Sequence, residues 1–296
     1  MAKQKENINE KPSKIFMDGF KSLCTTRHPY SVWSDFWQIS ALTIMNPLTK
    51  VGYQSDEKLK KVWEDRENNY LQLISKYSKE EVESITEMFA AVVIEFSKKP
   101  YQDFAGQLYM QLGISNSNAG QFFTPYHLCY AMAKMTQDHE HLRKLVKEHG
   151  WYTMYDCACG GGATMIAGCE IANEEFHRLN YRNHVLIVAN DIDLTCCCMC
   201  YVQLSLIGVA AIVTCSNALM QEDVNFYKEP EKVWFTPEYF SNVWSERRFF
   251  HGLDLNMHHN PNCGLGALFN SPNSSTTSNV ANDGDLDSWD EWDGEE

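Results

Sequence analysis

Apolar residues recur at intervals of three and four along the first third of the chain, from about Ser13 to Lys99. That spacing gathers them on one face of an α-helix. The stripes are formed in turn by Phe16, Phe20 and Leu23, by Val32, Trp33, Phe36 and Trp37, by Leu71, Leu73, Ile74 and Tyr77, and by Val82, Ile85, Met88, Phe89, Val92 and Val93. The pattern predicts a helical N-terminal region over residues 13–100, after a polar, disordered stretch over residues 1–12.

Beyond residue 100 the periodicity changes, and short apolar runs alternate with helical spacing. Helices are expected over residues 103–112, from Pro125 to about 136, over 166–179 and over 194–207, and strands over 185–189, 211–215 and 232–235. Alternation of this kind calls for a parallel sheet with helices on both faces. Residues 101–250 are therefore predicted to form an α/β domain of the Rossmann-like class.

The pattern fades after Arg248, and residues 270–296 are rich in Asn, Ser, Thr and Asp. Such a composition cannot support a packed core, which predicts a flexible acidic tail over residues 251–296. Acidic tails most often act as solubilising segments. Trp289 and Trp292 leave open a docking motif for a protein partner, or a mimic of DNA charge.

The formal net charge of the 296 residues is −14, which is unusual for a protein that binds DNA unaided, because such proteins place Lys and Arg against the phosphates. Eight acids between Asp283 and Glu296 account for part of it, so the remainder carries −6. No run reaches the roughly 18 to 20 apolar residues of a membrane span, and the N-terminus lacks the apolar core of a signal peptide. These features predict a cytoplasmic protein without a membrane partner.

The cysteines are eleven in number, and four of them fall within five helical positions: Cys196, Cys197, Cys198 and Cys200. Four thiols so arranged cannot all converge on one tetrahedral ion, and no C-x-x-C pair partners them. We therefore expect reduced thiols that fill space as small apolar groups, and no metal site.

A glycine cluster carries most of the chemical information. In Tyr155-Asp156-Cys157-Ala158-Cys159-Gly160-Gly161-Gly162-Ala163-Thr164, an acid is followed by glycines and small residues, as where a strand turns into a helix beside a nucleoside-type ligand. A second buried strand, residues 185–189, leads to Asp191, at the place where a ribose diol is usually held. The pair predicts a nucleotide-like pocket.

The phosphate-binding loops of other nucleotide folds do not occur, since neither G-x-G-x-x-G nor a Gly-Lys-Ser/Thr segment is found. Asp156 would repel a phosphate at the strand end. It suits a ligand that carries positive charge, such as S-adenosylmethionine with its amine and sulfonium.

Four segments in order resemble a known family: Gln121-Phe122-Phe123-Thr124-Pro125, the glycine cluster, Asp191-Ile192-Asp193 and Ser216-Asn217-Ala218-Leu219. Together they resemble the N6-adenine DNA methyltransferases of the type I modification-subunit kind, and look closest to the short stand-alone versions of phages and plasmids. The similarity covers roughly residues 100–245.

The resemblance implies roles for individual residues. The methionine end of the cofactor would contact Phe123 and Thr124 and the glycine cluster through Asp156, Ala158, Gly160 and Gly162. Asp191 would hold the ribose hydroxyls. The family usually has an acid where this chain has Asn217, whose amide oxygen would still accept from the adenine amine of the cofactor.

The family carries a base-binding motif, N/D-P-P-Y/F/W, at the end of the fourth strand. This chain contains no Asn-Pro-Pro. At about the expected distance stands Thr236-Pro237-Glu238-Tyr239, which resembles a degenerate version. Thr236, Pro237 and Tyr239 are predicted to form the base pocket, the hydroxyl accepting one hydrogen bond and the tyrosine stacking on the base. Asn260-Pro261-Asn262-Cys263 is a second candidate, but its neighbours His258 and His259 favour a surface turn.

The resemblance implies an S-adenosylmethionine-dependent DNA adenine-N6 methyltransferase that needs a partner for sequence recognition. The changed motif leaves a second hypothesis, a degenerate cofactor-binding protein with a regulatory or anti-restriction role. A third is methylation of an amine in RNA or protein.

Overall fold

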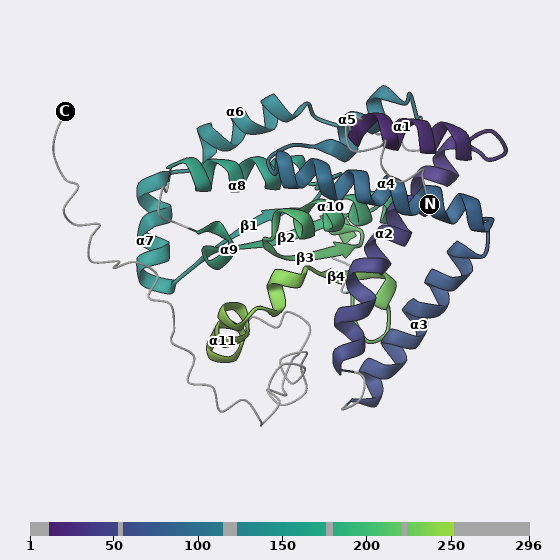
Figure 1. Ribbon diagram of the computed structural model, residues 1–296. Helices are drawn as coiled ribbons and strands as arrows, with labels where there is room; N and C mark the ends of the chain where they lie inside the picture. Colours follow the sequence, from purple (N-terminus) through teal and green to yellow (C-terminus); the bar gives the residue numbers. More distant parts are fainter. Residues whose placement is uncertain (1–11, 53–55, 115–122, 176–179, 221–223, 252–296) are drawn as a thin grey trace.

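The N-terminal region is helical, as its periodicity predicts. The computed structural model describes residues 12–52, 56–114, 123–175, 180–220 and 224–251. Helices and strands are labelled below as in Figure 1. Four helices form this region: α1 (Pro12–Leu23), α2 (Pro29–Gly52), α3 (Glu57–Ile74) and α4 (Lys79–Lys98). Three more, α5 (Phe104–Gln111), α6 (Tyr126–Thr136) and α7 (His139–His149), lead to the sheet. Except for Pro12 and His251, the stretches predicted as disordered, 1–12 and 251–296, lie outside the described residues.

The sheet has the strand order β1-β2-β3-β4, with β1 (Tyr152–Asp156), β2 (Val185–Asp191), β3 (Ala210–Cys215) and β4 (Val233–Phe235). The first three strands are parallel, and their register sets Asp156 beside Ala189 and Asp191 beside Cys215. Their carboxyl ends therefore share one edge of the sheet, where parallel α/β folds bind ligands. The mixed α/β class predicted from the alternating pattern is confirmed.

The fourth strand runs against the others. β4 pairs antiparallel with β3, Ile212 lying beside Phe235 and Thr214 beside Val233. Its carboxyl end consequently faces the amino end of β3, away from the edge that holds Asp156 and Asp191. The apolar run at residues 232–235 had predicted a strand, and only its direction differs from the parallel pattern.

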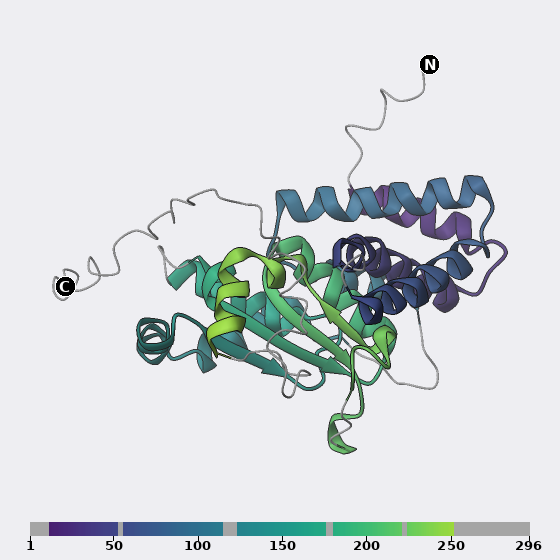
Figure 2. The ribbon, with the colours of Figure 1, turned by 90° about the horizontal axis from the view of Figure 1, so that it is seen from below.

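Two crossover helices, α8 (Ala163–Glu175) and α10 (Leu194–Ile207), connect successive parallel strands. Because both crossovers step in the same direction and such connections are right-handed, they lie on one face of the sheet. Figures 1 and 2 show α11 (Asn242–His251) crossing the other side. The remaining elements are the short α9 (Tyr181–His184), η2 (Ala218–Met220), η3 (Pro230–Lys232) and η4 (Pro237–Phe240).

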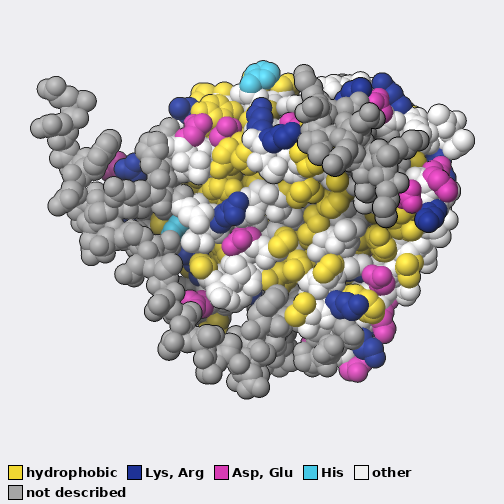
Figure 3. Space-filling view, viewed as in Figure 1, with side chains coloured by type: hydrophobic (Ala, Val, Ile, Leu, Met, Phe, Trp, Pro, Cys, Tyr) yellow, Lys and Arg dark blue, Asp and Glu magenta, His cyan; other side chains and the backbone are white. Residues whose placement is uncertain are grey.

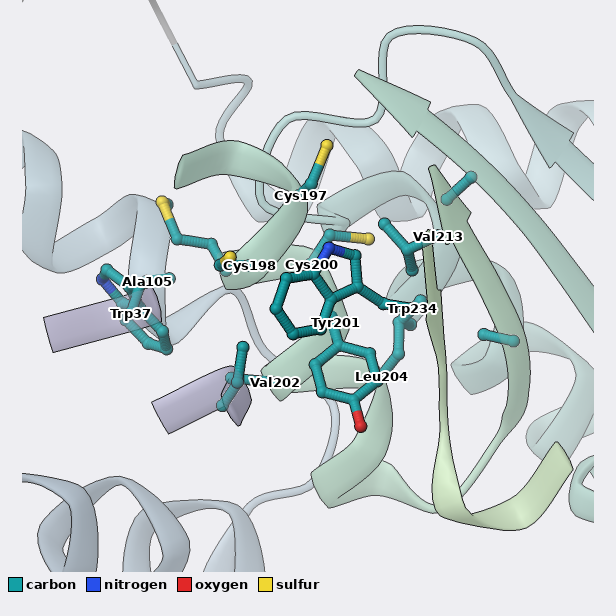
Figure 4. Close-up of a cluster of buried hydrophobic side chains, with 14 of the residues drawn as sticks. Trp37, Ala105, Cys197, Cys198, Cys200, Tyr201, Val202, Leu204, Val213 and Trp234 are labelled. Carbon is teal, nitrogen blue, oxygen red and sulfur yellow. The ribbon is translucent and has the colours of Figure 1, made fainter. Parts of the chain in front are cut away.

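The helical region packs on the sheet through α10. Figure 4 shows Trp37 of α2 and Ala105 of α5 on one side of α10, and Trp234 of β4 on the other. All four cysteines of α10 are at most 3% exposed. They fill this narrow layer in the way that small apolar side chains do.

Arg66 fastens α3 to β4. Its guanidinium is fully buried, its Nη2 donates to the carbonyl oxygens of Pro230 at 2.6 Å and Val233 at 2.5 Å, and it lies 4.9 Å from the centre of the Trp234 ring. Burial lowers the pKa of Arg66 to about 10.

Within the described part of the chain, no helix has both the length and the apolar character that a membrane crossing requires.

Candidate functional site

The glycine turn between β1 and α8 requires glycine at two places. Gly160 has φ +52° and Gly162 has φ +91°, in the region that side chains rarely adopt. A Cβ atom on Gly162 would stand 2.9 Å from the Cys200 sulfur. The turn can therefore pass this close to α10 only without a side chain.

Asp156 stabilises the turn from the end of β1. One carboxylate oxygen accepts the Ala158 N–H at 3.0 Å, and the other accepts the Thr164 hydroxyl at 2.6 Å. The first bond closes a local turn and the second ties β1 to the start of α8. The side chain of Asp156 stays half-buried, while Ala158 is exposed.

Asp191 joins the second strand directly to the glycine turn. Its Oδ2 accepts the Gly160 N–H at 2.9 Å, and its Oδ1 accepts the Asp193 N–H at 2.9 Å. A carboxylate has about four lone-pair sites, so two bonds leave it able to accept from hydroxyls of a ligand. The glycine cluster and the ribose-binding acid, predicted from segments 31 residues apart, are thus brought into contact.

Asn190 holds the three strand ends together and was missed by the sequence analysis. Its Nδ2 donates to the carbonyl oxygens of Cys157 at 3.3 Å and Ser216 at 3.0 Å, and its Oδ1 accepts the Ser216 and Thr214 hydroxyls. It is only 4% exposed. A polar residue at the end of an apolar strand is the one signal that could have pointed to it.

A second buried amide supports the turn from beneath. Gln203 of α10, fully buried, donates to the Gly161 carbonyl oxygen at 2.7 Å and to Asp103 at 3.2 Å, and accepts the Ala105 N–H at 3.0 Å. Burial raises the pKa of Asp103, against hydrogen bonds from Gly106 and Gln203 that lower it. Nothing in the spacing of α10 singles out Gln203 for this role.

Phe123 packs over the glycine turn. Its ring lies 3.4 Å from the position that a Cβ on Gly160 would take, and it meets Tyr109 edge to face at 5.0 Å. Thr124 follows at the start of α6 and is exposed, and its carbonyl oxygen lies 3.7 Å from the Cys129 sulfur. The structure therefore brings Phe123 to the predicted site. The Gln121 and Phe122 part of that segment lies outside the described residues.

The rim beside Asp191 is apolar and open. Ile192 is 72% exposed and Leu219 is 95% exposed. Asn217 lies at the same edge, but its Oδ1 already accepts the N–H groups of Leu219 at 3.1 Å and Met220 at 3.2 Å. The amide oxygen thus caps η2, and its lone pairs are partly occupied before any ligand arrives.

The structure does not bring Thr236, Pro237 and Tyr239 to this edge. Thr236 is fully buried at the amino end of β3, where its Oγ1 donates to the Val209 carbonyl oxygen at 2.7 Å and accepts the Ala211 N–H at 2.8 Å. Tyr239 is 2% exposed, stacked on Phe235 and covered by Arg248. This geometry favours a structural role for the segment, as the fastening of β4 to β3.

The helical region reaches the same edge from the side. The Tyr30 hydroxyl donates to Asp193 Oδ2 at 3.2 Å, and the Ser34 and Thr195 hydroxyls are 2.9 Å apart. A surface pocket of about 430 Å³ adjoins this contact, lined by Arg27, His28, Tyr30, Ser31, Ser34, Asp35 and Lys76. The N-terminal helices therefore fix the start of α10.

The chemistry of the edge suits a cationic nucleoside. Among the described residues, neither Asp156 nor Asp191 forms an ion pair with a Lys or Arg side chain, so both carboxylates are available to positive charge. Ile192, next to Asp191 in the chain, exposes an apolar side chain, and so does Leu219 in η2, the element that follows β3. Carboxylates, glycine backbone and apolar faces together match the ribose, charged and aromatic parts of such a ligand.

Comparison with known proteins gives one match. The family model described as N-6 DNA Methylase matches residues 103–262, more than half of the chain. No curated protein and no solved structure matches. The matched range begins at Asp103, the residue that caps α5 beneath the glycine turn, and extends eleven residues beyond the end of α11.

Proposed function

Because the chain belongs to the N-6 DNA methylase family, we propose that it binds S-adenosylmethionine at the edge formed by the glycine turn and Asp191, and serves the methylation of adenine N6 in DNA. The order of its motifs supports the type I modification-subunit kind, in a short stand-alone form. When bound, S-adenosylmethionine supplies a methyl group activated by its sulfonium.

The observation that carries the proposal is the 2.9 Å hydrogen bond from Gly160 N–H to Asp191. It fixes the ribose-binding acid against the backbone where the ligand must pass closest. Asp191 would accept the ribose hydroxyls, and Ile192 and Leu219 would lie against the adenine. Asp156 and Phe123 would face the charged methionine end, together with Thr124, Ala158 and Gly162.

We propose that the target base is held by Asn260 and Pro261 rather than by Thr236 and Tyr239. The family match continues to residue 262 and so includes Asn260-Pro261-Asn262, which lies outside the described residues. An asparagine amide oxygen can accept a hydrogen of the adenine amine, as this chemistry requires. The Thr236 hydroxyl is already bonded on both sides within the sheet.

A specificity partner is part of the proposal. The net charge of −14 works against independent binding to the DNA phosphates. On the face seen in Figure 3, Lys and Arg side chains are interspersed with Asp and Glu rather than gathered into one basic patch. Sequence recognition and much of the DNA affinity would therefore come from another protein.

One set of observations favours a second function. The chain lacks Asn-Pro-Pro, and Asn217, which replaces the usual acid, caps η2. Both features suit a protein that keeps the cofactor and uses it structurally, as a regulatory or anti-restriction factor. The eight acids after residue 282 would then present negative charge in place of DNA.

Transfer of a radiolabelled methyl group to adenine in DNA separates the two functions. With the products of neighbouring genes added as the specificity source, we expect transfer by the wild type, loss with Asn260→Ala and retention with the matched control Asn262→Ala. Cofactor binding should survive in both variants. Cofactor binding without transfer under every condition would favour the regulatory function, and equal activity of Asn260→Ala would remove Asn260 from the base pocket.

A further inference from the structure

Two thiols from different elements meet beside the candidate cofactor site. Cys197, fully buried, lies in the first turn of α10, and Cys215, partly exposed, ends β3. The Cys197 sulfur lies 3.3 Å from the carbonyl oxygen of Thr214, the residue before Cys215, and 3.6 Å from that of Asp191. The Cys215 sulfur lies 3.6 Å from the carbonyl oxygen of Ile192, the residue after Asp191. Both sulfurs therefore lie against adjoining backbone groups at the carboxyl ends of β2 and β3.

Figure 4 shows the direction of the Cys197 side chain within α10. Its sulfur points away from the sulfurs of Cys198 and Cys200. Cys197 instead faces the strand ends, where its sulfur is also 3.6 Å from the Asp191 carbonyl oxygen.

The pKa values of the two thiols are shifted in opposite directions. The hydrogen bond from Cys197 lowers the pKa of the Cys215 thiol, and Lys232 acts in the same direction, while burial, Asp193 and Asp191 oppose them. The hydrogen bond to Cys215, followed by burial, holds the pKa of Cys197 well above its usual range. The accessible sulfur is thus also the one that ionises more readily.

Exposure and a low thiol pKa are the two properties that make a cysteine reactive toward peroxides, and a neighbouring thiol can then complete a disulfide. The other thiol pair of the site, Cys159 and Cys200, does not combine them. Cys159 is 5% exposed and Cys200 is fully buried, and the hydrogen bond to Cys200 and burial raise the pKa of Cys159. Contact between thiols therefore does not by itself distinguish Cys197 and Cys215.

We propose that Cys215 and Cys197 form an oxidisable dithiol, which a hydroperoxide converts into a disulfide, and that this disulfide weakens cofactor binding at the adjoining edge. The oxidation depends only on the two sulfurs. Its effect on the cofactor rests on the proposed function.

The reaction balances with hydrogen peroxide as the oxidant. The Cys215 thiolate attacks one peroxide oxygen, an S–O bond forms as the O–O bond breaks, and the departing hydroxide takes up the proton released by Cys215 to become water. The Cys197 sulfur then attacks the Cys215 sulfur, so that the S–S bond forms as the S–O bond breaks. Hydroxide leaves with the Cys197 proton as a second water. The two sulfurs supply the two electrons that reduce the peroxide.

The disulfide would alter the loop that positions Asp191. As thiols, Cys197 lies 3.6 Å from the Asp191 carbonyl oxygen and Cys215 lies 3.6 Å from that of Ile192. A disulfide has no S–H, so both contacts to the loop after β2 are lost. Because each of these weak hydrogen bonds contributes only a small free energy, we expect their loss to weaken cofactor binding modestly, by about three- to tenfold.

Peptide mapping of the full-length protein tests the oxidation. The protein is treated with hydrogen peroxide, alkylated and digested with chymotrypsin, which can cut at Tyr201 and Leu204 between the two cysteines. We expect a linked pair containing Cys197 and Cys215 that a dithiol reductant reverses. Cys197→Ser should instead leave a sulfenic acid at Cys215 that dimedone captures, and Cys215→Ser should yield neither product.

The control variant is Cys24→Ser, which removes a partly exposed thiol whose pKa is raised by burial, and it should leave the linked pair unchanged. Absence of the pair in the wild type, or equal linkage of Cys159 to Cys200, overturns the assignment. Calorimetric titration with S-adenosylmethionine then tests the coupling, and equal affinity of the reduced and fully linked forms overturns it. Failure of the reduced protein to bind the cofactor would contradict the proposed function, while the mapping result would stand.

Discussion

Thr236 shows how a residue that resembles part of a catalytic motif can serve the sheet instead. Its hydroxyl bonds two backbone groups, those of Val209 just before β3 and of Ala211 within it, and its side chain has no exposed surface. A hydroxyl placed in this way lies at the edge of the sheet opposite to the one that carries Asp156 and Asp191.

Replacement of Thr236 by valine, which has nearly the same shape, isolates that role. We expect the free energy of unfolding to fall by about 2 to 4 kcal/mol, because the Ala211 N–H and the Val209 carbonyl oxygen lose a buried partner. Cofactor affinity should stay within a factor of two. Urea denaturation and calorimetry measure the two quantities. Unchanged stability combined with lost methyl transfer would return Thr236 to the base pocket.

Asp103 gives a prediction on pH at the same scale. Because burial raises its pKa, the folded protein holds the Asp103 proton more tightly than the unfolded chain does. The contribution of this group to stability therefore increases as the pH falls through the raised pKa toward the ordinary value of 3.8, and is lost as the pH rises again. An asparagine side chain at this position could not titrate.

The variant Asp103→Asn keeps an oxygen that can cap α5 while removing this titration. We expect the free energy of unfolding of the wild type, measured relative to the variant, to rise between pH 7 and pH 4. Urea denaturation of both proteins at several pH values measures it. A difference that is constant with pH, or that falls as the solution becomes more acidic, would contradict the assignment of a raised pKa to Asp103.

At the scale of elements, much of the fold follows from periodicity. The apolar spacing predicts α10 over residues 194–207, and the structure gives Leu194–Ile207. It does not predict α7, whose single fully buried residue is Val146, nor the short helix α11. The direction of β4 could not be predicted from the sequence either, because an apolar run of three residues packs the same way in either orientation.

The candidate site, too, can be predicted from the sequence only in part. Glycine clusters and acids at strand ends are visible in a sequence, and the structure brings Gly160 and Asp191 into contact. Asn190 and Gln203 are buried amides whose partners come from distant segments, so no local pattern reveals them. The position of Thr236 depended on strand order, which spacing along the chain does not determine.

The glycine turn yields a prediction with an internal control. Gly162 and Gly113 both have positive φ, but a Cβ would meet the Cys200 sulfur at 2.9 Å only at Gly162, and nothing within 4 Å at Gly113. We expect Gly113→Ala to lower the free energy of unfolding by about 1 to 2 kcal/mol from backbone strain alone. Gly162→Ala should lower it by about 3 kcal/mol or more, since crowding is added. Urea denaturation distinguishes them, and equal losses would contradict the crowding.

At the scale of the whole molecule, the helical region and the sheet are held together at several points. Arg66 connects α3 to β4, and Tyr30 connects α2 to the start of α10. The family match begins at residue 103, so helices α1 to α4 lie outside it while still bracing the strand end that carries Asp191. The helical region therefore supports the edge of the sheet that carries Asp191.

The central claim is that the edge between the glycine turn and Asp191 holds S-adenosylmethionine. Calorimetric titration of the reduced, full-length protein and of Asp191→Ala tests it most directly, with Asp65→Ala on α3 as the control for removal of an acid. We predict saturable binding of one cofactor per chain, a loss of about 1 to 3 kcal/mol of binding free energy with Asp191→Ala, and none with Asp65→Ala. No binding by the wild type, or equal affinity of wild type and Asp191→Ala, would contradict the account.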